Sequence, residues 1–136
     1  MSRMIFVNLP VKNVKASREF FAGLGFDFND QFSDEHTASM IVNDQAIVML
    51  LEEAKFKSFI RDDIADTSRV REVLVAVSAD SKDDVNTTCD KALSTGGSAW
   101  TDPQDHGFMY GRSFLDLDNH VWEVIWMDPA EVSGEH

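Results

Sequence analysis

The 136-residue sequence has one cysteine, three prolines and half as many basic as acidic residues. The lone cysteine, Cys89, excludes an internal disulfide, and its place in a helix-like segment favours a small core residue over a nucleophile. No apolar run approaches the roughly 20 residues that a membrane-spanning helix requires. The first ten residues lack the long apolar segment of a signal peptide, so we expect a cytoplasmic protein with no membrane partner.

The shortage of positive charge excludes a second class of partner. Acidic residues number 24 against 12 basic ones, which gives a formal net charge of −12. Such a chain repels nucleic acid and anionic lipid, so we expect neither as a partner. A cationic ligand would be attracted, but a solvated surface explains most of this charge equally well.

Apolar spacing predicts a strand, a helix and three strands in the first half of the chain. The run at residues 4–9 is β-rich and is expected to end at Pro10. Residues 14–24 have apolar groups at helical spacing and are closed by glycines. The further expected elements are strands at 26–32, 37–43 and 46–51, and a helical turn at about 56–60.

The same order of elements recurs in the second half, which predicts two βαβββ modules in tandem. Its expected elements are strands at 70–77, 98–101, 108–115 and 120–127, and a helix at 81–95. The predicted fold class is therefore α+β. We expect a single domain over residues 1–136, with module one at about 1–52, a connection at 53–69, module two at about 70–128 and a short C-terminal tail.

Glu123 is the strongest candidate for a functional residue. It lies between Trp122 and Trp126 in the apolar run at 121–126. A carboxylate is costly to bury in such a strand unless a metal ion, a basic side chain or a shared proton compensates it. Glu123 is thus either a ligand or general base, or an acid paired with Arg71 or Arg112.

A second group of candidates lies in the segment from Asp105 to Phe114. Strand alternation places Phe108, Tyr110 and Arg112 on one face, an aromatic wall with one cation that suits a planar or anionic ligand. His106 precedes this strand and could orient a substrate. The alternative reading is a loop histidine, a core tyrosine and a salt-bridged arginine.

Three segments together resemble the glyoxalase/bleomycin-resistance/extradiol-dioxygenase superfamily, the vicinal oxygen chelate fold. They are FVNLPVKNVKASREFFAGLGF, IVMLLE and RSFLDLDNHVWEVIWMDP, which begin at Phe6, Ile47 and Arg112. The resemblance covers nearly the whole chain. It implies that the paired modules form a curved, open, barrel-like mixed sheet around a cavity, with the helices outside, and that the protein is a homodimer.

The resemblance also implies a divalent metal, Zn, Ni, Mn or Fe, that acts as a Lewis acid. The family's ligand positions fall at Glu72 and Glu123, which have oxygen ligands, and at Phe6 and about Met49, which do not suit these metals. Two carboxylates could still hold a metal with the help of water or a histidine. An extradiol dioxygenase is not expected, because its histidine ligands are absent.

Three functions follow from these residues. The first is a glyoxalase-like enzyme, a metal-assisted lyase or isomerase of a small oxygenated molecule, in which Glu123 and Glu72 are catalytic. The second is a metal-free acidic protein of the bleomycin-resistance type that sequesters a small molecule. The third is a metal-independent enzyme with a glutamate acid/base pair. The residues expected to contact the ligand are Asn8, His106, Phe108, Tyr110 and Arg112.

Overall fold

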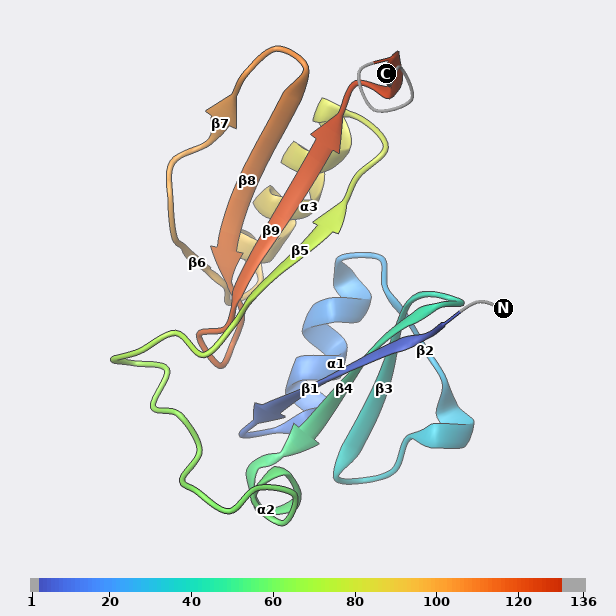
Figure 1. The fold of residues 1–136 in the computed structure, drawn as a ribbon, viewed down its shortest axis with the longest axis vertical. Helices are drawn as coiled ribbons and strands as arrows, with labels where there is room; N and C mark the ends of the chain where they lie inside the picture. The colour runs from blue at the N-terminus through green and yellow to red at the C-terminus, as the bar shows by residue number, and fades with distance from the viewer. Residues whose placement is uncertain (1–2, 131–136) are drawn as a thin grey trace. The chain divides into compact units, whose positions relative to one another are not determined.

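The structure, a computed structural model, describes residues 3–130 (Figure 1). The chain divides into two compact units, Met1–Val70 and Arg71–His136, and each is described by itself. The prediction of a single domain over both units stays a prediction. None of the helices in the described part of the chain is long and apolar enough to cross a membrane.

The first unit has one mixed sheet with the strand order β1-β4-β3-β2, in which β1 and β4 are parallel. Its elements are β1 (Ile5–Val11), α1 (Val14–Gly23), β2 (Asp27–Phe28), the 3-10 turn η1 (Asp30–Phe32), β3 (Thr37–Asn43), β4 (Ala46–Glu52) and α2 (Glu53–Lys57). This is the predicted βαβββ order, followed by a short helix.

Three boundaries in this unit differ from the prediction. The strand β1 continues through Pro10, because β1 is an edge strand and a proline there removes no hydrogen bond from the sheet interior. The strand expected at 26–32 ends at Phe28, because the Asn29 side chain accepts a hydrogen bond from the Gln31 N–H and begins η1. The turn expected at 56–60 is α2, which begins at Glu53.

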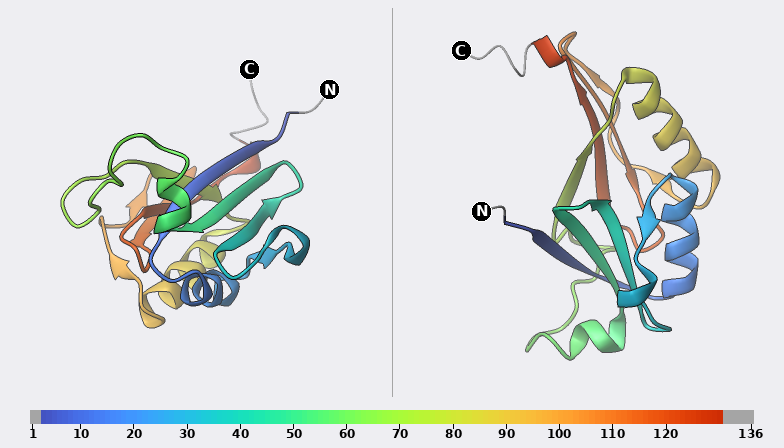
Figure 2. Two further views of the ribbon diagram at one scale, coloured as in Figure 1. Left: turned by 90° about the horizontal axis from the view of Figure 1, so that it is seen from below. Right: turned by 90° about the vertical axis from the view of Figure 1, so that its right-hand side faces the viewer.

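The core of the first unit lies between α1 and one face of its sheet (Figure 2). Asn13 caps the helix by accepting a hydrogen bond from the Ala16 N–H. Phe20 and Phe21 are buried and meet edge to face, with 5.0 Å between ring centroids. This geometry suits the charge distribution of aromatic rings and adds to the apolar burial.

The second unit repeats the arrangement with the strand order β5-β9-β8-β6, and β7 also pairs with β8. Its elements are β5 (Leu74–Ser78), α3 (Lys82–Ser94), β6 (Ser98–Ala99), β7 (Gln104–Asp105), β8 (Met109–Leu115) and β9 (Val121–Met127). The strand β5 begins at Leu74, not at residue 70, because its partner β9 begins at Val121, opposite Leu74. The short strand β7 was not predicted.

The helix α3 covers one face of this second sheet. Its buried side chains, Val85, Cys89 and Ala92, follow helical spacing. Burial raises the pKa of the Cys89 thiol to about 11, so the thiolate is rare at neutral pH. Cys89 is therefore a core residue, as the sequence predicted.

The turn between β8 and β9 is built around Asp116, whose side chain is almost fully buried. Its Oδ1 accepts hydrogen bonds from the backbone N–H groups of Asp118 and His120, and its Oδ2 accepts one from the Trp122 indole. Asn119 adopts a positive φ of 63°, which asparagine tolerates better than most residues. The turn is thus fixed by one carboxylate and one left-handed residue.

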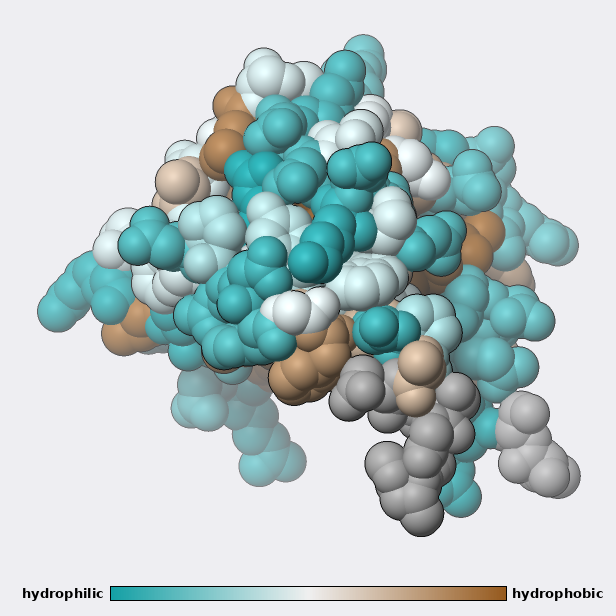
Figure 3. All heavy atoms as spheres, turned by 90° about the horizontal axis from the view of Figure 1, so that it is seen from above, coloured by the Kyte–Doolittle hydropathy of each residue, from teal (hydrophilic) through white to brown (hydrophobic). Residues whose placement is uncertain are grey.

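The tandem βαβββ prediction and the α+β class are confirmed. The chain has two mixed sheets and, among the described residues, three α-helices and no closed barrel. One face of the molecule is drawn in Figure 3, where hydrophilic residues predominate and hydrophobic ones form small separate groups.

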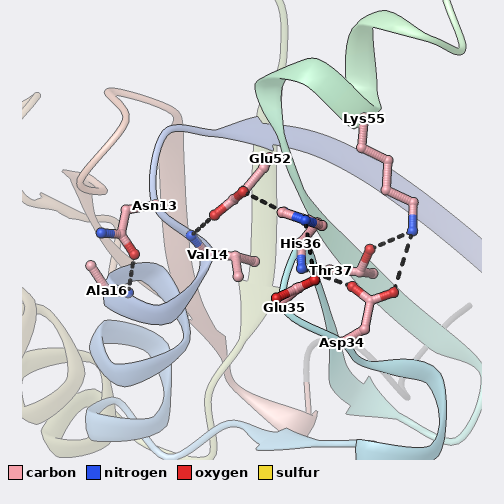
Figure 4. A network of polar contacts seen from close by, with 9 residues as sticks. All are labelled: Asn13, Val14, Ala16, Asp34, Glu35, His36, Thr37, Glu52 and Lys55. Carbon is pink, nitrogen blue, oxygen red and sulfur yellow. Dashed lines mark hydrogen bonds and ion pairs between the residues drawn. The ribbon is translucent and has the colours of Figure 1, made fainter.

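A polar network joins the end of β4 to the start of α1 (Figure 4). The Glu52 carboxylate contacts the His36 ring at 2.8 Å between Oε1 and Nδ1, and its Oε2 accepts a hydrogen bond from the Val14 N–H at 3.2 Å. The bond to Glu52 raises the pKa of His36 and the same bond lowers the pKa of Glu52. Both groups are therefore charged together at mildly acidic pH.

This network predicts a stability maximum at mildly acidic pH. The stabilisation from protonated His36 is complete below its ordinary pKa of 6.5 and is lost as pH rises through its raised pKa. The stabilisation from ionised Glu52 is complete above its ordinary pKa of 4.5 and is lost as pH falls through its lowered pKa. The stabilisation is thus full between about pH 4.5 and 6.5. We expect His36→Gln to lower the melting temperature more within this window than above it. If the melting temperatures of the wild type and His36→Gln differed by the same amount at every pH, the His36–Glu52 contact would not be the source of the effect.

Candidate functional site

The candidate site lies on the face of the second sheet opposite α3. Along β9, Trp122 and Val124 are buried on the α3 side, so Glu123 and Ile125 point the other way. In the sheet register Glu123 lies between Ala76 of β5 and Ser113 of β8. Within residues 71–130 no helix covers this face.

Glu123 lines a pocket of about 220 Å³. Its other lining residues are Thr101, Asp102, Gln104, Met109, Gly111, Arg112, Ser113 and Ile125. The segment from β6 to β7 supplies the polar rim, because β6 and β7 both pair with β8 and hold residues 101–104 beside that strand. The residues that line the pocket thus include two carboxylates, an amide, two hydroxyls and Arg112.

The two hydroxyls are arranged by direct hydrogen bonds. The Ser113 Oγ accepts a hydrogen bond from the Thr101 N–H at 3.0 Å and lies 2.7 Å from the Thr101 Oγ1. When Ser113 donates to Thr101 in this contact, the Thr101 hydroxyl proton is left to donate to a ligand. A donor and the Glu123 acceptor are then available in the same pocket.

The Glu123 carboxylate is half-buried and, within the described residues of its own unit, makes no hydrogen bond or ion pair. A carboxylate with empty acceptor positions in a pocket is prepared to accept hydrogen bonds or a proton from a bound molecule. The pairing with Arg71 or Arg112, considered from the sequence, is not formed: Arg112 bonds to Asp90, and Arg71 stacks on Trp100 at 4.7 Å.

Glu72, the other predicted catalytic carboxylate, lies next to the β8–β9 turn. Its Oε1 is 3.3 Å from the Nδ1 of His120, a histidine whose side chain is 1% exposed. This contact between residues 48 positions apart holds the segment before β5 against the turn. Glu72 lies outside the set of residues that line the Glu123 pocket.

The predicted aromatic wall lies on the α3 side of β8. The Tyr110 hydroxyl and the Arg112 guanidinium both donate to the Asn86 Oδ1, and Phe114 is buried. Phe108 precedes β8 and is 49% exposed, with the His106 ring 6.5 Å from its own. The shared face of Tyr110 and Arg112 is as predicted, but α3 occupies it, and the ligand-binding role of these residues stays a prediction.

The remaining predicted residues belong to the first unit. Asn8 and Met49 lie opposite each other on β1 and β4, and Phe6 is on the same side of β1 as Asn8. Asn8 lines a separate pocket of about 470 Å³ with three apolar side chains of the segment after β4. That segment contributes Phe56, Phe59 and Ile60.

The predicted metal donors do not fit a divalent ion of the glyoxalase type. Phe6 has no donor atom, and the Met49 thioether suits soft metals. Glu72 contacts His120. In the part of the chain that the structure describes, no three His, Cys, Asp or Glu side chains converge on one point.

Thr101, Ser113 and Gln104 were not identified from the sequence. Their side chains are common polar types without a motif, and only the pairing of β6 and β7 with β8 brings them beside Glu123. The one available signal was strand alternation, which places Ser113 and Gly111 on the face of the strand opposite Arg112.

Solved structures share the fold at low sequence identity. A hypothetical protein from S. aureus is 23% identical, with a TM-score of 0.79 over 93% of this chain and 95% of that one. A glyoxalase-related enzyme from Fulvimarina pelagi is 14% identical, with a TM-score of 0.76 over 93% and 88%. A fosfomycin resistance protein from Listeria monocytogenes is 16% identical, with a TM-score of 0.67 over 96% and 98%.

No curated protein is significantly similar to the chain in sequence. The family model described as the glyoxalase/bleomycin resistance protein/dioxygenase superfamily matches residues 3–124. The match spans both βαβββ modules and ends one residue after Glu123. The chain therefore belongs to the glyoxalase/bleomycin resistance protein/dioxygenase superfamily.

Proposed function

We propose that the chain is a glyoxalase-like protein that binds a small oxygenated molecule in the Glu123 pocket, without a metal at the family's usual positions. The observation that supports this most strongly is the half-buried Glu123 carboxylate, which lacks a partner in its own unit and lines a pocket. The metal-assisted lyase favoured from the sequence has less support, because Phe6 and Met49 offer no suitable donor.

The lining of the pocket defines the ligand chemistry. Glu123 and Asp102 accept hydrogen bonds, and the Gln104 amide both donates and accepts. The charge of Arg112 is balanced by Asp90 at 2.9 Å. A neutral or cationic molecule rich in hydroxyl groups matches this lining, whereas two nearby carboxylates repel an anion such as the phosphonate fosfomycin.

The proposal predicts that Glu123→Gln weakens binding of dihydroxyacetone or glyceraldehyde by about tenfold or more. A hydrogen bond to a charged acceptor contributes about 1.5–3 kcal/mol, which the amide does not fully replace. Titration followed by NMR measures this effect, and shifts at the amides of Thr101 and Ser113 locate the ligand. The matched control is Glu53→Gln, at an exposed glutamate of the first unit. If Glu123→Gln and Glu53→Gln bound the ligand with equal affinity, Glu123 would not be part of the binding site.

A second candidate function, metal-free acid/base catalysis, is favoured by the donor beside Glu123. The Glu123 carboxylate would take a proton from the carbon next to a ligand carbonyl, and the Thr101 hydroxyl would donate a hydrogen bond to the enolate oxygen. If the proton on Glu123 first exchanges with water, its return to the same carbon places a solvent hydrogen there. If it returns instead to the neighbouring carbon, and the hydroxyl proton of that carbon moves to the enolate oxygen, the result is an isomerisation. Dihydroxyacetone in D₂O tests this: deuterium incorporation must be faster than in buffer and must be lost in Glu123→Gln.

We also propose a cytoplasmic homodimer. The edge strand β1 supports the dimer: within the described sheet of the first unit no strand pairs with its outer side, Ile5 and Phe6 are more than half exposed, and such an edge favours pairing with a second chain. Light scattering of the purified protein tests it.

The predicted ligand contact of Asn8 belongs to the separate pocket in the first unit and stays a prediction.

A further inference from the structure

A second, apolar pocket adjoins the Glu123 pocket on the same sheet. Its volume is about 450 Å³, and it shares Ile125 with the Glu123 pocket. Its lining residues are Ala76, Val77, Ser78, Ala79, Ile125, Met127 and Pro129. No charged side chain is among them, so the face changes from polar to apolar along β9 from Glu123 to Met127.

Small side chains create the space for this apolar pocket. Ala76 and Ser78 alternate on the exposed side of β5, and Ser78 is opposite Ile125 in the sheet register. Met127 is 47% exposed, although a side chain of its kind is stabilised by burial. An apolar group laid against Ile125 and Met127 would remove both from water.

We infer that the ligand is an amphiphile with a hydroxyl-rich head in the Glu123 pocket and a short unbranched apolar tail that crosses Ile125 to Met127. This inference rests on the proposed function and deepens it, because it names the class of ligand. Because Ile125 lines both pockets, a single molecule that crosses its side chain would contact both. The two residues from Ile125 to Met127 span about 7 Å, which limits the tail to several carbon atoms.

A series of glycerol 1-ethers with methyl, propyl and pentyl chains tests the inference by calorimetry. Each buried methylene contributes about 0.8 kcal/mol, so the affinity should rise about fourfold per added carbon, or about 15-fold from methyl to propyl. The gain should diminish once the tail passes Met127. An affinity that does not change along the series would overturn the inference, even if the methyl ether binds.

The variant Ser78→Leu separates the tail from the head. A leucine side chain at this position would occupy the part of the apolar pocket beside Ile125, so the gain in affinity from the methyl to the pentyl ether should largely disappear. The matched control is Ser94→Leu, the same change at an exposed position of α3 outside both pockets, which should keep the gain. Equal melting temperatures establish that the variants are folded. If Ser78→Leu binds the pentyl ether like the wild type, the tail does not lie there. If no ether binds, methyl included, the proposed function fails and this inference with it.

Discussion

Replacement of Asp116 by alanine will lower the free energy of unfolding by about 3–5 kcal/mol, because three donors lose their acceptor at a cost of about 1–3 kcal/mol for each buried one. The carboxylate accepts two backbone N–H groups and the Trp122 indole, and alanine would leave all three donors without an acceptor. Burial raises the pKa of Asp116, so desolvation offsets part of what these bonds contribute. Urea unfolding followed by tryptophan fluorescence measures the loss.

Two further variants give this prediction its control. Asp116→Asn retains Oδ1 as an acceptor for the backbone, so it should lose less than half as much stability as Asp116→Ala. Asp62→Ala removes an exposed carboxylate and should change stability by no more than about 0.5 kcal/mol. Equal losses in Asp116→Ala and Asp62→Ala would show that the turn does not depend on the carboxylate.

Replacement of Phe21 by alanine will also destabilise the protein by about 3–5 kcal/mol, here through a cavity in the first unit. The Phe21 side chain is 1% exposed and meets the rings of Phe20 and Phe26 at 5.0 and 6.0 Å between centroids. Phe21 lies on the face of α1 that packs on the sheet, and neighbouring groups relax only partly into a space left between a helix and a sheet. Chemical denaturation measured by circular dichroism gives the free energy.

Phe32→Ala is the matched control for Phe21→Ala. The same atoms are removed from a side chain that is 64% exposed at the end of η1. We expect a change of no more than about 0.5 kcal/mol. If both variants lost the same stability, the α1 interface would not be the core of this unit.

Local pattern predicted most of the fold, because its signals are short in range. The helical spacing of Val14, Phe20 and Phe21 directly reflects the face of α1 that packs on the sheet. Pairing between strands was harder to predict from the sequence, because it joins residues that are far apart in the chain. The sequence could not show that β1 is an edge strand that accommodates Pro10, or that β7 pairs two polar residues with β8.

Among the residues that line the candidate pocket, the sequence pointed to Glu123 through its apolar neighbours, which is a local signal, and its functional role stays a prediction. Alternation grouped Tyr110 with Arg112 on one face, but alternation does not tell which face a helix covers, and α3 holds both through Asn86. The contact of Glu72 with His120 joins residues 48 positions apart and has no sequence signature.

Cys89 gives the second unit a built-in reporter. It is the only thiol in the chain, it is fully buried on the face of α3 that packs on the sheet, and its raised pKa suppresses the reactive thiolate. Alkylation in the native protein therefore requires α3 to open, so the rate of modification by iodoacetamide measures the opening equilibrium of that helix without an added label. The effect of a ligand on local opening in the second unit can thus be followed by mass spectrometry as the fraction of Cys89 that is alkylated.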